Sequence, residues 1–257
     1  MKAMIFDVDG TLADTERDGH RVAFNMAFAE AGLDWVWDEE SYGRLLEVTG
    51  GKERIRFYIE GEGGGGVDMD QDAEVLDKWI ADLHASKTRH FLSLLEQGRI
   101  PLRSGVRRLL TEAHNAGITL AVATTTTPQN VTALLEHAMF SGAESWFQVV
   151  GAGDIVPNKK PASDIYDYVI EQLGLSSEEC IAFEDSHNGL LSARGAGLKT
   201  IVTVNGYTEN EDFSGAALVL DQMGELDDPC RLLGGVGQKR PLLDLEWVRA
   251  VWGGTAA

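Results

Sequence analysis

Short apolar runs alternate with helical patterns along most of this chain, and this rhythm limits the fold it can adopt. The runs expected to be strands are Ala3–Val8, Ile118–Ala123, Phe147–Val150, Cys180–Phe183, Thr200–Val204 and Leu218–Leu220. The helical patterns that lie between most of them are Val106–Asn115, Gln129–Ala138, Ser163–Leu173 and His187–Ala196. Strands that alternate with helices favour a parallel sheet with helices on both faces. We therefore predict an α/β fold whose core is a doubly wound, Rossmann-like parallel sheet.

One long segment interrupts this rhythm directly after the first strand. It holds helical patterns and no convincing strand, and the patterns are Arg17–Ala31, Glu39–Leu46, Lys52–Ile59 and Gln71–Leu95. We predict a helical cap domain of residues 15–96, inserted into a catalytic core of residues 1–14 and 97–257. The glycine-rich run 61–66 is expected to be a flexible surface loop. Near the end of the chain, residues 242–252 are expected to form an amphipathic helix that docks through Leu245, Val248 and Trp252.

Composition argues against several classes of partner. The chain has 257 residues, of which 44% are hydrophobic and 25% charged, and it can bury a sizeable core. Its formal net charge of −19 argues against nucleic acid and anionic membranes as partners. No apolar run reaches about 18 residues, so no transmembrane helix is expected. Because the first expected strand begins almost at Met1, no signal or transit peptide is expected within the given sequence. Cys180 and Cys230 are far apart, which fits a reducing compartment without a disulfide or zinc site.

Two aspartates follow the first apolar run, in the segment Phe6-Asp7-Val8-Asp9-Gly10-Thr11-Leu12. They stand at the strand end where open α/β sheets bind ligands, and alternate residues of an extended chain project the same way. An ionised Asp7 is predicted to attack phosphorus and form an aspartyl-phosphate. Asp9 would protonate the leaving alkoxide and then deprotonate the attacking water. Gly10 suits the sharp turn and adds no Cβ near the anion. A solvated surface turn would explain this pair alone, but not the motifs that follow.

Acidic residues also follow the strand expected at Cys180–Phe183, in the order Glu184-Asp185-Ser186. Oxygen ligands suit Mg²⁺, which would screen the two anions that have to meet. We predict that Mg²⁺ is held by the side chains of Asp7 and Asp185 and by the backbone carbonyl of Asp9. Glu184 would bind the ion through a water molecule. The alternative is that Asp185 or Ser186 caps the following helix.

Hydroxyl groups and a lysine predict a site for the transferring phosphate. Thr124, Thr125, Thr126 and Asn130 line a loop before a helix N-terminus, where side-chain and backbone donors can cradle a phosphate. Thr124 is the strongest candidate of the set. Lys160, in Lys159-Lys160-Pro161, would hold the phosphoryl oxygens and offset the carboxylates. A capping threonine or a solvated lysine would explain one of these residues, but not the whole set.

These segments resemble, in order and spacing, the four motifs of the haloacid dehalogenase-like hydrolase superfamily. The matching residues are Asp7-x-Asp9-Gly10-Thr11, Thr124, Lys160 and Glu184-Asp185. The inserted segment resembles the helical cap shared by phosphoglycolate phosphatases, β-phosphoglucomutases and sugar-phosphate phosphatases. Residues in this segment and just before it look like those of the CbbY-type phosphatases, at Asp14-Thr15-Glu16, His20, Trp35-Val36-Trp37, Tyr42, 49–54 and 84–88. Ser104 and Ser163 depart from the family, because relatives usually carry proline there.

The resemblance implies a reaction and a substrate. CbbY-type enzymes are Mg²⁺-dependent phosphatases that convert xylulose-1,5-bisphosphate, an inhibitor of Rubisco, to xylulose 5-phosphate. They are associated with Calvin-cycle operons and chloroplasts. We expect a monomer of the cytoplasm, or of the chloroplast stroma if the source is a plant or alga and a transit peptide was removed.

Polar residues of the inserted segment predict a second phosphate site. Gly50-Gly51 before a helix forms an anion nest to which Lys52 adds a positive charge, and His84 and Lys87 share a helix face. Glu16 and Tyr42 would contact sugar hydroxyls. The predicted substrate-binding residues of this segment are Glu16, His20, Tyr42, Thr49, Gly50, Gly51, Lys52, Glu53, Arg54, His84, Ser86 and Lys87. The alternative is that these side chains belong to solvated helix faces.

Other functions share part of this pattern. A hexose-phosphate mutase would use the same Asp7 and Asp9 but return the phosphoryl group to its intermediate. Residues 49–54 and 84–87 favour the phosphatase. A phosphatase of other sugar monophosphates also stays open. A non-catalytic sugar-phosphate sensor would be expected to lack one of the core acidic residues, and the sequence retains all of them.

Overall fold

The structure, a computed structural model, describes residues 1–48, 50–63, 72–235 and 239–254. It divides into two compact units. The core unit comprises Met1–Asp14 and Pro101–Ala257, and the inserted unit comprises Thr15–Ile100. None of the helices among the described residues is long and apolar enough to cross a membrane.

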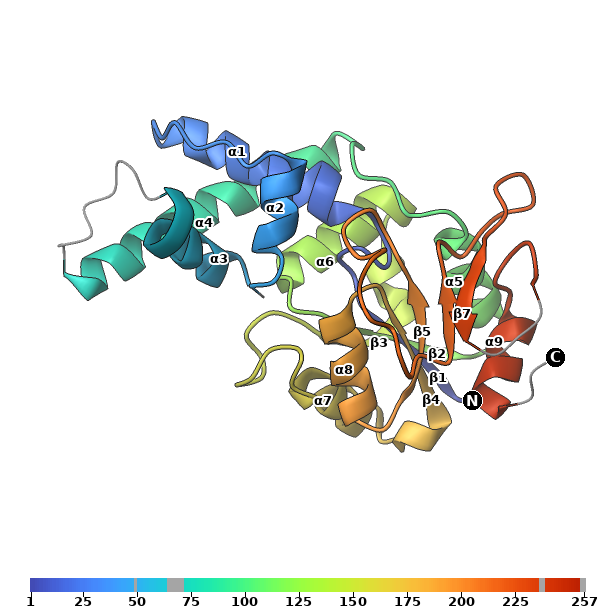
Figure 1. The fold of residues 1–257 in the computed structure, drawn as a ribbon. Coiled ribbons are helices and arrows are strands. Elements are labelled where there is room, and N and C mark those ends of the chain that lie inside the picture. Colours follow the sequence, from blue (N-terminus) through green and yellow to red (C-terminus); the bar gives the residue numbers. More distant parts are fainter. Residues whose placement is uncertain (49, 64–71, 236–238, 255–257) are drawn as a thin grey trace. The chain divides into compact units, whose positions relative to one another are not determined.

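A seven-stranded sheet of order β3-β2-β1-β4-β5-β6-β7 forms the centre of the core unit (Figure 1). The strands are β1 Ala3–Phe6, β2 Thr119–Ala123, β3 Phe147–Gly151, β4 Cys180–Glu184, β5 Lys199–Thr203, β6 Leu218–Leu220 and β7 Leu232–Gly235. Neighbouring strands from β3 to β6 pair in parallel, whereas β7 pairs antiparallel with β6. The predicted α/β parallel-sheet fold is confirmed. The sequence patterns did not predict β7, because its residues Leu-Leu-Gly-Gly lack the alternation of a half-buried strand.

Helices of the core unit lie between successive strands from β1 to β5, as the alternation in the sequence predicts, and a further helix follows β7. They are α5 Val106–Asn115, α6 Pro128–Leu134, α7 Asp164–Leu173, α8 His187–Gly195 and α9 Leu245–Gly253. The helix expected to reach Ala138 ends as an α-helix at Leu134 and continues as a π-helical turn, Leu135–Met139. The predicted docking of α9 is confirmed at Val248, and Trp247 is a buried residue of this helix that the prediction did not include. Leu245 and Trp252 are half-buried.

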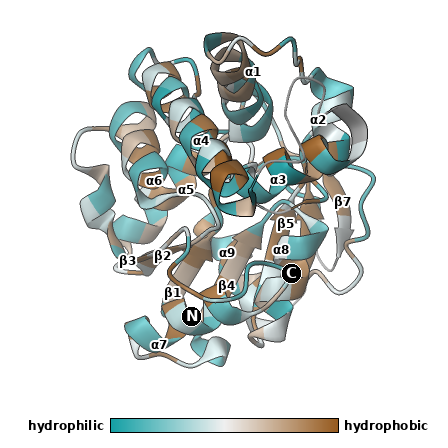
Figure 2. Ribbon diagram, turned by 90° about the vertical axis from the view of Figure 1, so that its left-hand side faces the viewer, coloured by the Kyte–Doolittle hydropathy of each residue, from teal (hydrophilic) through white to brown (hydrophobic). Residues whose placement is uncertain are grey.

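The strands of the core sheet are more hydrophobic than the helices that lie against them (Figure 2). Every residue of β1 is inaccessible to solvent, and the rings of Phe6 and Phe183 stack with centroids 4.4 Å apart. A parallel sheet buried on both faces needs such continuous apolar strands. The polar residues that follow β1 and β4 are therefore positioned by strands that are buried on both faces of the sheet.

The described residues of the inserted unit form helices and no strand. The helices are α1 Arg21–Glu30, α2 Glu39–Leu45, α3 Gly51–Tyr58 and α4 Ala73–Glu96, with π-helical turns at Glu16–His20 and Ile59–Gly63. An aromatic cluster packs between these helices. In it, the ring centroids of Phe24 and Phe28 each lie 4.8 Å from the ring centroid of Trp37. Part of the glycine-rich run expected to be a loop, residues 61–63, belongs to the second helical turn. Residues 64–66 of that run lie outside the described residues.

The chain leaves and re-enters the core unit through two segments that lie side by side. Ala13 and Leu102 form an isolated antiparallel bridge. Next to it, the backbone N–H of Arg103 donates to the carbonyl of Leu12 at 2.9 Å. Backbone hydrogen bonds within the core unit therefore join the segment that leads into the inserted unit to the segment that returns from it.

Candidate active site

Four charged side chains of the core unit meet at the carboxyl ends of β1 and β4. Asp7 follows β1, Glu184 ends β4, Asp185 follows it, and Lys160 precedes α7. Oxygen atoms of the three carboxylates all lie within 4.8 Å of one another. Lys160 Nζ donates to Asp7 Oδ1 and to Glu184 Oε1, each at 2.6 Å. The meeting follows from the topology, because β1 and β4 are parallel neighbours that pair Phe6 with Phe183.

Burial sets the electrostatics of this cluster. Asp7, Lys160, Glu184 and Asp185 are respectively 6%, 7%, 1% and 6% exposed. Burial raises the pKa of Asp7 to about 8; Lys160 opposes this shift, and the Glu184 and Asp9 carboxylates add to it. Burial and the charges of Asp7 and Glu184 also raise the pKa of Asp185. Although burial alone would lower it, the pKa of Lys160 is raised by Asp7 and Glu184, so the lysine stays charged.

The donor set of the cluster suits a divalent cation. One lysine faces three buried carboxylates, and a metal ion would oppose through its own charge the raised pKa values of Asp7 and Asp185. Glu184 Oε2 is buried and has no hydrogen-bond partner among the described residues. A buried oxygen left in this way is costly unless a ligand or water satisfies it. The ligands are all oxygen atoms, which is the preference of Mg²⁺.

Two glycines leave room for the carboxylates. Gly10 has a φ of 87°, and a Cβ there would lie 2.2 Å from Asp185 Oδ2. A Cβ on Gly189, in the first turn of α8, would lie 1.9 Å from Glu184 Oε2. Ser186 caps α8 by accepting from the N–H of Gly189 at 3.1 Å. Since Ser186 performs the capping, Asp185 is left to face Asp7. Asp9 lies in the same turn as Gly10, half-buried and bridged to Ala13.

The threonine-rich loop follows β2, at the same edge of the sheet as Asp7. Thr124 is buried, and its Oγ1 accepts from the N–H of Thr126 at 3.2 Å. Asn130 Nδ2 donates to Thr126 Oγ1 at 3.0 Å, whereas Thr125 is half-buried. Thr127 caps α6 by accepting from the N–H of Asn130 at 3.3 Å. A cap thus explains Thr127 and leaves the hydroxyl of Thr124 at the edge of the sheet.

Three predicted residues of the inserted unit form one hydrogen-bonded group, in which Tyr42 and Arg54 are buried and Glu16 is half-buried. Tyr42 donates its hydroxyl hydrogen to Glu16 Oε2 at 2.5 Å and accepts from an Arg54 guanidinium nitrogen at 2.8 Å. Arg54 also donates to the carbonyls of Leu45 and Val48. Its charge and the Glu16 carboxylate therefore hold the Tyr42 hydroxyl between them.

A second group contains Lys87 and His20. Lys87 is buried, and its Nζ lies 2.8 Å from His20 Nδ1. Because an ammonium group can only donate, Nδ1 is the acceptor. Lys87 Nζ also lies 5.0 Å from the ring centroid of Phe24 and 5.4 Å from that of Phe91. These rings and the imidazole fix the position of the buried cation.

The other predicted residues of this unit are more dispersed. The ring of His84 packs on Gly51, where a Cβ would lie 2.6 Å from it, and Gly50 caps α3 with a φ of 102°. Lys52 and Glu53 are exposed in the first turn of α3. Ser86 donates to Glu30 Oε2 at 2.5 Å, so it belongs to another polar group than Lys87. Thr49 lies outside the described residues.

Two contacts to the cluster come from residues that the sequence patterns did not single out. Tyr166 donates to Glu184 Oε1 at 2.5 Å, and burial together with the Glu184 charge raises the pKa of this hydroxyl. Asn205 Nδ2 donates to Asp185 Oδ2 at 2.7 Å. Tyr166 occupies a position of α7 that reads as ordinary apolar core. Asn205 could have been found from the sequence, because it is a polar residue directly after the strand expected to end at Val204.

Comparisons with known proteins agree with this geometry. A family model for haloacid dehalogenase-like hydrolases matches residues 1–197. CbbY from Cereibacter sphaeroides is 47% identical over 226 residues, which cover 88% of this chain and 94% of that protein. Two crystal structures of CbbY from Rhodobacter sphaeroides are also similar. One, in complex with phosphate, has a TM-score of 0.78 and 47% identity, and the match covers 86% of this chain and 94% of the other. The other, a mutant in complex with xylulose-1,5-bisphosphate, has a TM-score of 0.79 and 45% identity over 88% and 98% of the two chains.

Proposed function

Because this chain belongs to the haloacid dehalogenase-like hydrolases and is a sugar phosphatase of the CbbY type, we propose that it hydrolyses xylulose-1,5-bisphosphate to xylulose 5-phosphate and phosphate. The observation that carries the proposal is the buried cluster of Asp7, Glu184, Asp185 and Lys160. The solved CbbY complex with that bisphosphate supports the choice of substrate. Such a reaction removes a compound that inhibits Rubisco.

Asp7 is the proposed nucleophile. One of its oxygens bonds to phosphorus while the bond from phosphorus to the sugar oxygen breaks, which gives an aspartyl-phosphate. Asp9 gives a proton to the departing sugar oxygen and later takes one from the water that hydrolyses the intermediate. Lys160, which donates to Asp7, would hold the phosphoryl oxygens together with Thr124. Thr125, Thr126 and Asn130 complete the proposed cradle.

The cluster would hold Mg²⁺ through Asp7, Asp185 and the carbonyl of Asp9, with Glu184 acting through water. When bound, the ion neutralises the carboxylates and the phosphate so that two anionic groups can approach each other. The buried oxygen of Glu184 that lacks a hydrogen-bond partner among the described residues supports this assignment.

The inserted unit is proposed as a cap that recognises the rest of the substrate. The second phosphate would bind at the first turn of α3 with Lys52, Lys87 and His84, as oriented N–H groups and cations favour an anion. Glu16 and Tyr42, which Arg54 holds in place, are suited to sugar hydroxyls. Binding energy from such a remote group can raise the turnover rate as well as the affinity.

The test is a phosphate-release assay with Mg²⁺ over a panel of mono- and bisphosphorylated ketoses, with glucose 1-phosphate as a mutase substrate. We expect the highest kcat/KM for xylulose-1,5-bisphosphate, with xylulose 5-phosphate as the product in ³¹P NMR. A preference for ribulose-1,5-bisphosphate or for monophosphates would refute the proposed substrate but would not contradict the phosphatase activity. Conversion of glucose 1-phosphate to glucose 6-phosphate without net phosphate release would favour the mutase.

A further inference from the structure

The Asp185 carboxylate is held by donors on both of its oxygens. Asn205 Nδ2 donates to Oδ2 at 2.7 Å, whereas Thr11 Oγ1 lies 3.4 Å from Oδ1. At the longer distance the threonine bond is weak. Asn205 therefore contributes the stronger of these two hydrogen bonds to a carboxylate that is 6% exposed.

The amide of Asn205 has one possible orientation. Its Oδ1 accepts from the N–H of Tyr207 at 2.9 Å, which forms a tight turn after β5. The backbone N–H of Asn205 donates to Thr208 Oγ1 at 3.0 Å, and the N–H of Thr208 returns a bond to the Asn205 carbonyl at 3.1 Å. Because Oδ1 faces an N–H donor, the NH₂ group must face Asp185.

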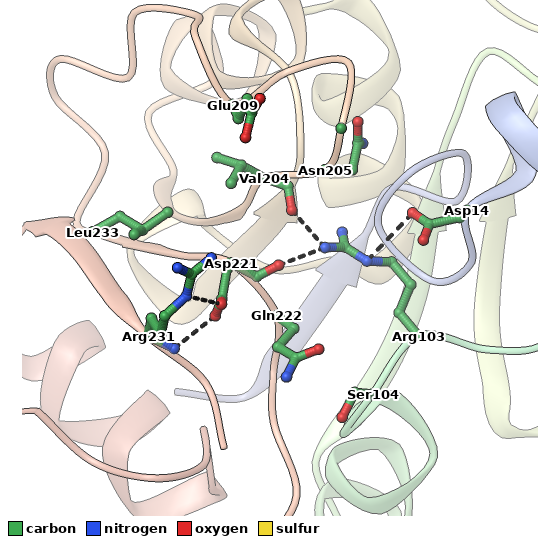
Figure 3. A pocket seen from close by; sticks show the side chains of 11 residues that line it. Asp14, Arg103, Ser104, Val204, Asn205, Glu209, Asp221, Gln222, Arg231 and Leu233 are labelled. Atoms are coloured by element: carbon green, nitrogen blue, oxygen red, sulfur yellow. Dashed lines mark hydrogen bonds and ion pairs between the residues drawn. The ribbon is translucent and has the colours of Figure 1, made fainter. Parts of the chain in front are cut away.

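The strand end that carries Asn205 is clamped by Arg103. The Arg103 guanidinium donates to the carbonyls of Thr203 at 2.9 Å, Val204 at 2.5 Å and Asp221 at 2.7 Å, and also to that of Gly10. Figure 3 shows this side chain reaching Val204 and Asp221, with Asn205 next along the chain, beside a pocket of about 550 Å³. One buried guanidinium thus ties the turn after Asp9 to the segment that holds Asn205.

Close packing removes the remaining freedom of the amide. A Cβ on Gly10 would lie 2.7 Å from Asn205 Nδ2, so the amide lies directly against the backbone of the aspartate turn. We propose that Asn205 is a positioning residue, which orients the Asp185 carboxylate for the divalent cation of the proposed phosphatase. The inference rests on that function. It assigns a role in the reaction to a residue outside the motifs of the sequence.

The experiment compares Asn205→Ala with Asn205→Ser. Serine can accept from the N–H of residue 207 and keep the turn, but it is too short to reach Asp185. The affinity for Mn²⁺ is measured by electron paramagnetic resonance of the free ion, and kcat and KM are measured with Mg²⁺. Both variants should bind Mn²⁺ about 10- to 100-fold more weakly, which is the usual effect of losing a group that orients a metal ligand. We expect kcat to fall with the affinity and KM to change little.

Asn25→Ala is the matched control. Asn25 is half-buried like Asn205, and its amide bonds only to the backbone of Trp37, at 2.9 and 2.8 Å, among the described contacts. The Asn25→Ala substitution should lower the melting temperature measured in EDTA without changing the affinity for Mn²⁺. Wild-type Mn²⁺ affinity in Asn205→Ser would overturn the proposal, because holding the turn would then be the whole role of Asn205. A wild-type chain that binds no Mn²⁺ would instead contradict the proposed function.

Discussion

The ammonium nitrogen of Lys160 lies 2.6 Å from a carboxylate oxygen of Asp7, and both side chains are buried. The same nitrogen lies 2.6 Å from Glu184, so one cation offsets two carboxylates. Such an arrangement is costly to disturb, because removing one partner leaves buried charges without compensation.

Lys160→Met should lower the free energy of unfolding by about 3–5 kcal/mol when EDTA is present, the usual effect of breaking a buried ion pair. Urea unfolding measures this change. Lys159→Met is the control, since Lys159 pairs with the exposed Asp154 at 3.2 Å and its loss should cost about 1 kcal/mol or less. Equal losses in the two variants would contradict the role of Lys160 in the cluster.

Asp7→Asn should abolish turnover, because an amide neither attacks phosphorus nor binds Mg²⁺ well. Asp9→Asn should retain substrate binding and lower kcat by about 10²-fold or more, the scale of a lost general acid and base. Steady-state kinetics and binding measurements separate these effects. The exposed Asp227 provides a control, as Asp227→Asn should leave both parameters unchanged. Near-normal turnover in Asp7→Asn would exclude it as the nucleophile.

Removal of divalent cations with EDTA should abolish phosphate release, and added Mg²⁺ should restore it. Ca²⁺ should restore little activity, because it takes more ligands in a looser geometry than Mg²⁺. The assay is a titration of each cation into the chelated enzyme. Full activity in excess chelator, or equal rates with both ions, would argue against the proposed magnesium site.

Lys52→Ala should reduce kcat/KM for the bisphosphate by about 30-fold or more, since a lost charged contact to a bound phosphate costs about 2–5 kcal/mol. Acetyl phosphate lacks the second phosphate, so its hydrolysis should barely change. Lys78→Ala is a control of the same charge, because Lys78 is also exposed in the inserted unit. Equal losses on both substrates would mean that Lys52 acts through folding rather than recognition.

The two cysteines should resist thiol reagents in the folded protein. Cys180 and Cys230 are 1% and 2% exposed. Burial raises the pKa of the Cys180 thiol to about 11, and it raises the pKa of Cys230 as well. Since the thiolate is the reactive form and burial disfavours it, neither should react with Ellman's reagent at pH 8 until guanidinium unfolds the chain. Rapid labelling of the native protein would contradict this expectation.

The sequence predicted the parts of the molecule that rest on local patterns. Continuous apolar runs bounded by turn residues are typical of buried parallel strands, and this was enough for the fold class. Because the carboxyl ends of parallel strands share one edge, Asp7 and Asp185 could be expected to meet although they are far apart in the chain. The pairing of β1 with β4, which brings them together, was beyond the sequence patterns.

Other features depend on tertiary contacts that local patterns do not encode. Tyr166 has the apolar spacing of a core residue, and only the fold turns its hydroxyl toward Glu184. Ser86 has the residue type of a ligand contact, yet it donates to Glu30. On α9, Trp247 is buried although the face expected to dock did not include it.

The bridge between Ala13 and Leu102 also has a meaning for engineering. The whole inserted unit is attached to the core at two adjacent points, so its ends already lie where a short peptide could join them. The entropic cost of bringing the two ends of such a segment together grows only slowly with its length. Inserted units from related enzymes are therefore candidates for exchange at these two junctions, which would change the proposed substrate-recognition residues and leave the proposed catalytic cluster of the core unit intact.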